Sequence, residues 1–466
     1  MKRNIMQHLL QLIIFLMINI SGAQVVRQGQ FLSQRIVLEG KMDLSANDTL
    51  QLSLPDYGYN NVSMPVIIKE DSIIATNAQF GFSLKAKMEN DSQWNCNFSL
   101  PNTKEYEVAL HIVDSVLPLT FPQHPTPPFP YEVTRINFTG KKTGISYGGT
   151  LTTPKDKEHY PVAILISGTG KQDRDYVYAG HQFFTVLADA LARKGIASLR
   201  VDDRGIGETG GDFEKATTAD FADDAEEALE YLIDNKSASP EMTGLIGHSE
   251  GGIISTIVAS RNPHVNFMIS LSGVGVSGMK ILELQNKAIL NAQGIDSLVV
   301  SDYMELFNEL FSTVYKNSDP DSLETEIKNS LQGWMALKDE ETLKQLQLVD
   351  GRDENFLYRY NRQANSPWYR YMIRYEPEPY MAKINIPVLA VNGDRDIMVP
   401  AKENLEGFSS GIKGNNLTTV TYQGLNHFYQ HCVSCTNREM GELQEVFAPE
   451  VLAAISKWIN QQFKEQ

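Results

Sequence analysis

The chain has 466 residues, of which 42% are hydrophobic and 21% are charged, and this composition is ordinary for a soluble globular protein. Its length suggests two or three domains, since a domain averages roughly 150 residues. The formal net charge of −16 at pH 7 argues against a nucleic-acid partner, because binding a polyanion normally needs a basic surface.

Residues 1–23 predict a secretory signal peptide. Two basic residues near the start precede the apolar run 12–18, and the small residues 21–23 supply a cleavage site. We expect cleavage before Gln24 and a secreted or periplasmic mature protein. The alternative is an uncleaved membrane anchor, but the apolar run is shorter than the ~20 residues that a spanning helix needs, and no other segment reaches that length. No membrane span is therefore expected after signal removal.

Residues 24–120 show the alternation of apolar and polar residues that is typical of half-buried strands. This alternation runs through 50–54, 80–84, 94–98 and 106–112, and turn-forming Asn, Asp and Gly separate the segments. We expect a small antiparallel β-sandwich domain. No catalytic constellation appears in it, so its role is either structural and positioning or that of a binding module.

A proline-rich linker is predicted at 121–131. Residues 122–130 contain five prolines, which favour an extended, semi-rigid connection. The composition therefore places a domain boundary here, and a second domain at 132–466.

In the second domain, apolar strands alternate with amphipathic helices. We expect these strands at 162–166, 197–201, 244–247, 267–271, 386–391 and 417–420. Fully apolar strands separated by helices indicate a parallel sheet that is covered on both faces. The pattern predicts an α/β fold with a doubly wound, mostly parallel sheet.

The strand pattern stops between about 276 and 383, where a helical, charge-rich segment intervenes. We expect this insertion to form a helical cap above the carboxyl ends of the strands, where ligands bind in sheets of this kind. The natural substrate depends on the shape of this cap, which the sequence does not give.

The segment 244–252 (GLIGHSEGG) predicts a nucleophile elbow at Ser249. In such an elbow a strand turns sharply into a helix, so that the serine hydroxyl stands at the top of the sheet. Side chains at Gly247 and Gly251 would collide with the neighbouring strand and helix. The alternative is a glycine-rich turn that holds an ordinary serine.

Ser249 would need two partners. A serine hydroxyl is a poor nucleophile at neutral pH, so an imidazole must take its proton and a carboxylate must orient the imidazole. In this architecture the acid follows a late strand and the histidine follows the last one. Asp396 and His427 fit these places, with Asp394 as the second candidate for the acid. Either aspartate could instead cap the following helix, and the histidine could be structural.

An oxyanion hole needs two backbone N–H donors. The N–H of Glu250 directly follows the serine, and the loop 167–170 (SGTG) follows the first parallel strand, where Thr169 is placed to supply the second donor. The alternative for this loop is a phosphate cradle, but it lacks the lysine and the serine/threonine spacing of a P-loop.

The three cysteines do not form a disulfide framework. Cys432 and Cys435 could form a local disulfide or half of a zinc site, but no second pair of ligands is evident. We expect neither a metal nor a cofactor.

Six segments in order along the second domain form a larger pattern: 165–175 (LISGTGKQDRD), 202–212 (DDRGIGETGGD), 219–225 (ADFADDA), 247–252 (GHSEGG), 392–400 (NGDRDIMVP) and 424–428 (GLNHF). Together they resemble the secreted or cytoplasmic carboxylesterases of the α/β-hydrolase superfamily that are often labelled serine-aminopeptidase-like. The resemblance covers roughly residue 118 to the C-terminus. The N-terminal β domain lies outside it.

The resemblance implies an α/β-hydrolase fold and a triad of Ser249, Asp396 and His427, with the N–H groups of Thr169 and Glu250 as oxyanion donors. The charged clusters at 173–175 and 202–204 are expected to form structural ion pairs near this site, with contact to substrate as the alternative.

We therefore predict a secreted serine hydrolase that cleaves small-molecule carboxylic esters through an acyl-enzyme. The first alternative is an aminopeptidase or amidase with the same triad, in which an acidic cap residue or Glu250 binds a free amino group. The second is a non-catalytic binding protein on a hydrolase fold. Fold and triad alone do not set the leaving group.

Overall fold

The computed structural model describes residues 24–463 except for 32–33, 42–43, 46–47, 55–58, 70–71, 91–92, 101–104, 115–120, 156, 158, 236–238, 318 and 347. The predicted signal peptide lies outside the described residues. The chain divides into two compact units, the first ending at Phe121 and the second beginning at Pro122, apart from 178–180 and 441–444, which belong to the first.

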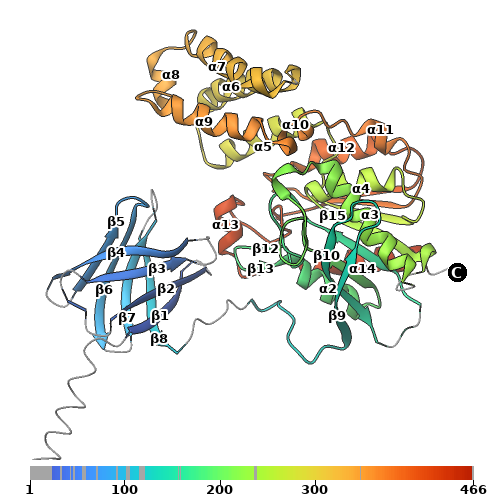
Figure 1. Ribbon diagram of the computed structural model, residues 1–466, viewed down its shortest axis with the longest axis horizontal. Helices are drawn as coiled ribbons and strands as arrows, with labels where there is room; N and C mark the ends of the chain where they lie inside the picture. The colour runs from blue at the N-terminus through green and yellow to red at the C-terminus, as the bar shows by residue number, and fades with distance from the viewer. Residues whose placement is uncertain are drawn as a thin grey trace, which may run out of the picture. The chain divides into compact units, whose positions relative to one another are not determined.

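The first unit is a closed barrel of eight antiparallel strands that pair in chain order, with β1 pairing β8 to close it (Figure 1). The strands are β1 (Gln24–Phe31), β2 (Gln34–Lys41), β3 (Thr49–Leu54), β4 (Tyr59–Lys69), β5 (Ser72–Asn77), β6 (Phe82–Asn90), β7 (Gln93–Ser99) and β8 (Tyr106–Val113).

The interior of the barrel is built from the predicted alternation. Leu50, Leu52 and Leu54 of β3 and Trp94 and Phe98 of β7 are fully buried, while their neighbours along each strand are more exposed. The prediction of an antiparallel all-β domain is confirmed, but the sheet closes on itself instead of forming the expected two-layered sandwich. Alternation shows that one face of each strand is buried, and it does not distinguish these two ways of burying it.

The second unit is built on an eight-stranded sheet with the order β18-β17-β16-β15-β11-β14-β10-β9. The strands are β9 (Tyr131–Thr139), β10 (Ser146–Pro154), β11 (Val162–Ile166), β14 (Ala197–Val201), β15 (Thr243–His248), β16 (Phe267–Leu271), β17 (Val388–Gly393) and β18 (Leu417–Tyr422). From β18 to β14 neighbouring strands are parallel, whereas β10 and β9 are antiparallel additions at one edge. This is the mostly parallel sheet of an α/β-hydrolase, as predicted.

The edge strands β9 and β10 were not predicted from the sequence. The local pattern of β10 is weak, because it contains two glycines and three threonines and few large apolar residues. β10 pairs with β14, from Gly149 opposite Val201 to Thr152 opposite Ser198. This contact joins distant parts of the chain, so the local hydrophobic pattern does not predict it.

Helices cover the sheet on both faces (Figure 1). They are α2 (Phe183–Arg193), α3 (Thr218–Asp234), α4 (Glu250–Ala259), α12 (Ala401–Gly411) and α14 (Pro449–Gln462). A further short helix, α13 (Asn437–Glu442), lies between β18 and α14 in the chain. Along α3, Ala225, Ala228, Leu229 and Leu232 pack into the core with the apolar residues of β11. A capping box at Thr217 starts α3, since its side chain and that of Asp220 each accept the other's backbone N–H.

The segment between β16 and β17 is helical, as expected for an insertion. It contains α5 (Gly278–Ala292), α6 (Ser297–Lys316), α7 (Pro320–Met335), α8 (Glu340–Gln345), α9 (Arg352–Ala364), α10 (Pro367–Met372) and α11 (Glu378–Met381). Aspartate side chains cap the N-termini of α6, α7 and α8. The insertion has a hydrophobic core of its own, which includes Phe311, Trp334 and Tyr360.

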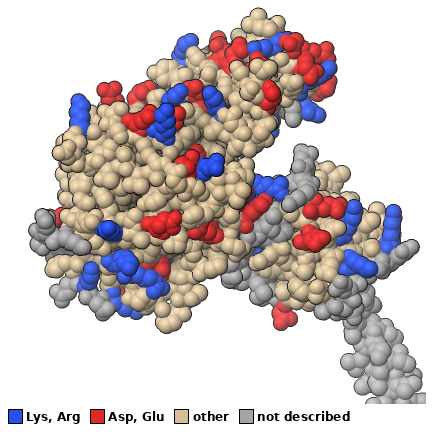
Figure 2. Space-filling model, turned by 180° about the vertical axis from the view of Figure 1, so that it is seen from behind, with Lys and Arg blue, Asp and Glu red and all other residues tan. Residues whose placement is uncertain are grey.

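Two surface properties follow from the described residues. Acidic and basic side chains are interspersed on the face shown in Figure 2, and most of that surface carries neither. Among the described helices, none is both long and apolar enough to cross a membrane.

Candidate active site

Ser249 stands at a sharp turn between a strand and a helix. β15 ends at His248 and α4 begins at Glu250. The serine has φ 56° and ψ −118°, a left-handed backbone conformation that residues with a side chain rarely adopt. A strained serine between a strand and a helix is the geometry of a nucleophile elbow, which presents the hydroxyl above the end of the strand.

Two glycines leave room for this turn. A Cβ atom at Gly247 would collide with the backbone carbonyl of Gly251, and one at Gly251 would collide with the backbone carbonyl of Ile166 on β11. The helix and the two strands therefore approach each other more closely than any side chain would allow. The collisions expected from the sequence are found at both positions.

His427 is held by Asp396. Nδ1 of the imidazole donates a hydrogen bond of 2.8 Å to Oδ2 of the carboxylate, and both side chains are almost completely buried. The other carboxylate oxygen accepts the backbone N–H groups of Met398 and Val399, each at 2.8 Å. These bonds fix the imidazole with Nδ1 as the donor, which leaves Nε2 to accept a proton.

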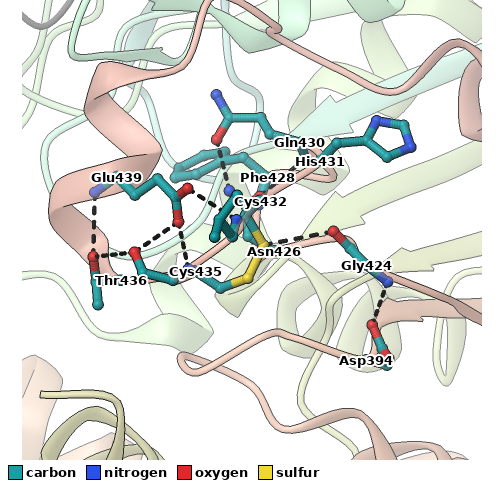
Figure 3. The surroundings of a disulfide bond; sticks show 12 residues. Asp394, Gly424, Asn426, Phe428, Gln430, His431, Cys432, Cys435, Thr436 and Glu439 are labelled. Atoms are coloured by element: carbon teal, nitrogen blue, oxygen red, sulfur yellow. Dashed lines mark hydrogen bonds between the residues drawn. A yellow bond between two sulfur atoms is a disulfide. The ribbon is translucent and has the colours of Figure 1, made fainter. Parts of the chain in front are cut away.

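Asp394 has a different role from Asp396. It is exposed, and its Oδ1 accepts the backbone N–H of Gly424 at 2.6 Å (Figure 3). This bond anchors the start of the loop that carries His427. Of the two aspartates that the sequence left open, only Asp396 contacts the imidazole.

The loop after His427 is closed by a disulfide between Cys432 and Cys435 (Figure 3). The backbone N–H of Cys432 donates to the carbonyl of Gly424, and the side chain of Glu439 accepts the N–H of Cys435. The loop therefore returns to its own start around the histidine. This pairing answers the question that the sequence left open between a disulfide and half of a zinc site, and no cluster that could ligate a metal occurs among the described residues.

His248 connects this loop to the opposite side of the site. Its Nε2–H donates to the backbone carbonyl of His427 at 2.9 Å, and its Nδ1 accepts from the hydroxyl of Tyr176 at 3.0 Å. Burial of the ring lowers the pKa of His248 well below its usual value, and the neighbouring His427 lowers it further. The imidazole therefore stays neutral, with the tautomer that these two bonds require.

The loop 167–170 follows β11 and brings the second predicted oxyanion donor to the elbow. We call it the oxyanion loop. A Cβ at Gly168 would crowd the hydroxyl of Tyr176 and the Cβ of Ser249, so the loop backbone passes directly beside the serine. Within the described residues, neither the N–H of Thr169 nor that of Glu250 has a hydrogen-bond partner. Two such free donors are what a developing oxyanion requires.

The carboxyl group of Glu250 joins three segments beneath these donors. Oε2 accepts from the hydroxyl of Thr169 at 2.8 Å, and Oε1 accepts from the hydroxyl of Thr218 and from the indole N–H of Trp368, both at 2.7 Å. The side chain is completely buried, and burial raises its pKa, while the three hydrogen bonds oppose that shift. Glu250 thus ties the oxyanion loop, α3 and the helical insertion to the elbow.

In the described chain, the charged clusters next to the oxyanion loop form ion pairs at every residue except Asp173 and Asp203. Arg174 pairs with Asp202, and Arg204 pairs with Asp224. Asp203 instead accepts from the hydroxyl of Ser167 and from a backbone N–H, and burial raises its pKa to about 8. A cavity of about 270 Å³ lies beside these residues and the oxyanion loop.

The structure brings the predicted residues together in two groups. Asp396 contacts His427, and the side chains of Thr169 and Glu250 contact each other beside Ser249. In the described chain the hydroxyl of Ser249 makes no hydrogen bond to His427, and such bonds are often long or poorly aligned until substrate binds.

Sequence reasoning missed three further side chains of the site. His248 lies within the elbow motif, so its position next to the serine was the available signal. Tyr176 and Trp368 carry no local signal, because each reaches the site through a contact between residues far apart in the chain.

Comparisons with known proteins give a matching family model and a distant relative. The family model described as serine aminopeptidase, S33, matches residues 180–430. Esterase EstD of Thermotoga maritima is 22% identical over 280 residues, which are 60% of this chain and 57% of that protein, so the chain spans little more than half the length of this relative.

Two solved structures give TM-scores below one half. Est1E of Butyrivibrio proteoclasticus, solved with ferulic acid bound, has a TM-score of 0.41 at 20% identity, over 71% of this chain and 100% of that one. An esterase of Pyrococcus furiosus has a TM-score of 0.43 at 13% identity, over 71% and 91% of the two chains.

Proposed function

The chain belongs to the serine aminopeptidase S33 family of α/β-hydrolases, and we propose that it hydrolyses carboxylic esters through an acyl-enzyme on Ser249. The observation that carries the proposal is the imidazole of His427, which Asp396 holds through Nδ1 and whose backbone carbonyl accepts from His248, the residue before the strained Ser249. Family membership supports hydrolase chemistry, and this geometry supports an acyl-enzyme on Ser249.

The proposed reaction has two steps. In the first, the hydroxyl oxygen of Ser249 attacks the ester carbonyl while His427 takes the hydroxyl proton at Nε2. The N–H groups of Thr169 and Glu250 stabilise the oxyanion. The tetrahedral intermediate then collapses, and His427 gives its proton to the departing alcohol. In the second step, water gives a proton to His427 and attacks the acyl-serine, which releases the carboxylic acid and restores Ser249.

An ester substrate is favoured over a peptide with a free N-terminus by the state of Glu250. An aminopeptidase needs a carboxylate that is available to the substrate's ammonium group. Both oxygens of Glu250 already accept hydrogen bonds from protein donors, and the side chain is completely buried. The relative named as an esterase, EstD, supports the same choice. The aminopeptidase hypothesis is supported by the description of the family, serine aminopeptidase, and the test below includes it as an outcome.

The test uses a fluorophosphonate probe and two families of substrate. Full-length protein, Ser249→Ala and the exposed-serine control Ser410→Ala are labelled and then assayed on nitrophenyl esters and on aminoacyl nitroanilides. We expect labelling and ester turnover in all but Ser249→Ala, whose kcat/KM falls by roughly four orders of magnitude or more. Absence of Ser249-dependent labelling would refute a catalytic role for this serine. Faster turnover of the anilides would replace the esterase with an aminopeptidase.

The localisation remains part of the proposal. We propose that the mature protein begins at Gln24 and is exported. N-terminal sequencing of protein recovered outside the cytoplasm tests this, and an intact Met1 on that protein would contradict it.

A further inference from the structure

We propose that the acyl group of the ester binds in the cavity beside the oxyanion loop, and that this acyl group is apolar and uncharged. This inference rests on the proposed ester hydrolysis at Ser249. It adds which part of the substrate enters the cavity and what chemistry that part has.

The cavity extends from the oxyanion loop into the space between the sheet and its helices. Its volume is about 270 Å³, and its apolar lining includes Ile164 on β11, Val201 on β14, Ala225 on α3 and Ile254 on α4. Trp368 of α10 contributes the aromatic wall from the insertion. A mostly apolar lining with a few polar groups is typical of a small-molecule site.

The lining of the cavity includes both residues that carry the predicted oxyanion donors. Thr169 and Glu250 both line it, whereas Ser249, Asp396 and His427 do not. A carbonyl oxygen held by the two N–H groups would therefore place one substituent of the carbonyl carbon against the cavity, and the other would extend away from it.

Sheet order decides which substituent enters. The leaving-group oxygen must approach His427, because that imidazole protonates it. Asp396 follows β17 and His427 follows β18, and both strands lie on one side of β15. The strand residues that line the cavity come from β11 and β14, on the other side of β15. The alcohol therefore faces β17 and β18, and the acyl group faces the cavity.

The charges around the cavity exclude an anionic acyl group. The lining includes five carboxyl side chains and no lysine or arginine, and the five are Asp202, Asp203, Glu214, Asp224 and Glu250. Three of them are neutralised by ion pairs: Asp202 pairs with Arg174, Glu214 with Lys171, and Asp224 with Arg204. A carboxylate on the acyl group would find no cation in this lining.

A cationic acyl group is not favoured either. In the described chain Asp203 and Glu250 have no cationic partner, but the oxygens of both already accept hydrogen bonds from the protein. Burial raises the pKa of both groups, so neither holds a full negative charge as readily as an exposed carboxylate does. An uncharged group is therefore the best match.

The volume sets the size of that group. An apolar cavity of about 150 Å³ accommodates benzene, so 270 Å³ has room for a phenyl ring on a short linker or for a medium-length aliphatic chain. We expect kcat/KM to be higher for nitrophenyl octanoate and nitrophenyl phenylacetate than for nitrophenyl acetate. For nitrophenyl dodecanoate, whose chain is too long for the cavity, kcat/KM should be lower than for the octanoate.

The experiment changes the volume of the cavity in both directions. Ala225→Leu fills it from α3, and Phe213→Ala widens it from the short helix η2 (Phe213–Lys215). The ratio of kcat/KM for octanoate to that for acetate should fall by about tenfold or more in Ala225→Leu, because one methylene in an apolar pocket changes discrimination by that amount. In Phe213→Ala the optimum should move to longer chains.

The matched control is Ala219→Leu, the same substitution on the same helix at a half-exposed position that does not line the cavity. It should leave the ratio unchanged.

A charge series adds a second measure, in which the butyrate ester should be hydrolysed faster than either the monosuccinate or an aminoacyl ester.

The outcomes separate the two proposals. If acetate is hydrolysed in a Ser249-dependent way but neither cavity variant changes the chain-length ratio, the acyl assignment is wrong and the esterase proposal stands. Preference for the monosuccinate or aminoacyl ester also overturns the assignment. If no ester is hydrolysed and Ser249 is not labelled, both proposals fail. Should Ala225→Leu not fold, the shift in Phe213→Ala decides.

Discussion

The indole Nε1–H of Trp368 donates a hydrogen bond of 2.7 Å to Oε1 of Glu250. Trp368 belongs to the helical insertion, and Glu250 is the first residue of the helix that follows the elbow. The insertion is therefore bonded directly to the residue whose N–H is a predicted oxyanion donor. The contact ties the turn at Ser249 to the insertion.

Replacing this tryptophan tests that contact. Trp368→Phe removes the donor and keeps an aromatic wall, so we expect kcat/KM for nitrophenyl acetate to fall by about 2- to 10-fold, which corresponds to one net hydrogen bond. Trp334→Phe is the control, since that indole N–H is buried in the insertion and has no hydrogen-bond partner among the described residues. Equal losses in both variants would show that the effect comes from the insertion's stability and not from Glu250.

His248 should act as a positioning residue for His427. His248→Leu removes both of its hydrogen bonds and leaves the carbonyl of His427 without its donor, so we expect kcat to fall by about 5- to 100-fold with KM little changed. His248→Gln keeps an N–H donor and should recover part of that loss. A change confined to KM, or no recovery in the glutamine variant, would contradict this role.

Asp203 should make stability depend on pH. Burial raises its folded-state pKa from 3.8 to about 8, so the folded protein keeps a proton that the unfolded chain releases. This group's contribution to the free energy of unfolding is therefore largest below pH 4, and it is lost as pH rises from about 4 to 8, by about 1.4 kcal/mol per pH unit at most. Above pH 8 it changes no further.

The measurement is urea unfolding between pH 5 and 8. Asp203→Asn cannot titrate and keeps the side-chain oxygen that faces Ser167, so its stability should fall less steeply with pH than that of the parent protein. Glu406→Gln, at an exposed position on α12, should keep the parent slope. Identical slopes in Asp203→Asn and the parent would mean that Asp203 is ionised in the folded protein at neutral pH.

The disulfide should stabilise the histidine loop. Breaking a bond that closes so short a segment of chain costs about 2 kcal/mol in the chain-entropy model, so the Cys432→Ser, Cys435→Ser double variant should unfold at a lower temperature and turn over esters more slowly. Dithiothreitol should reproduce both effects in the parent protein. It should have no effect on the double variant, because the remaining cysteine, Cys96, is a buried free thiol and leaves no disulfide to reduce.

The sequence predicted those parts of the fold that local patterns record. The apolar runs at 162–166 and 267–271 coincide with β11 and β16, and the helix expected from Thr218 is α3. The elbow was predictable because Gly247, Ser249 and Gly251 lie within one run of five residues.

Contacts between distant segments were not predictable in the same way. Closure of the barrel depends on β1 meeting β8, and the edge strand β10 depends on its pairing with β14. The bond from Trp368 to Glu250 joins residues 118 positions apart. Hydrophobic periodicity describes one face of one element, so it does not say which distant side chain will donate to a buried carboxyl group.

The strands on either side of the helical insertion, β16 and β17, are hydrogen-bonded neighbours in the sheet. The chain thus leaves the sheet and returns to the adjacent position, whatever the intervening length. Over evolutionary time such an insertion can be lengthened, shortened or exchanged while the register of the sheet stays the same. The bond from Trp368 restricts this freedom at one point, because an insertion without this indole leaves Oε1 of Glu250 with Thr218 as its remaining donor among the described residues.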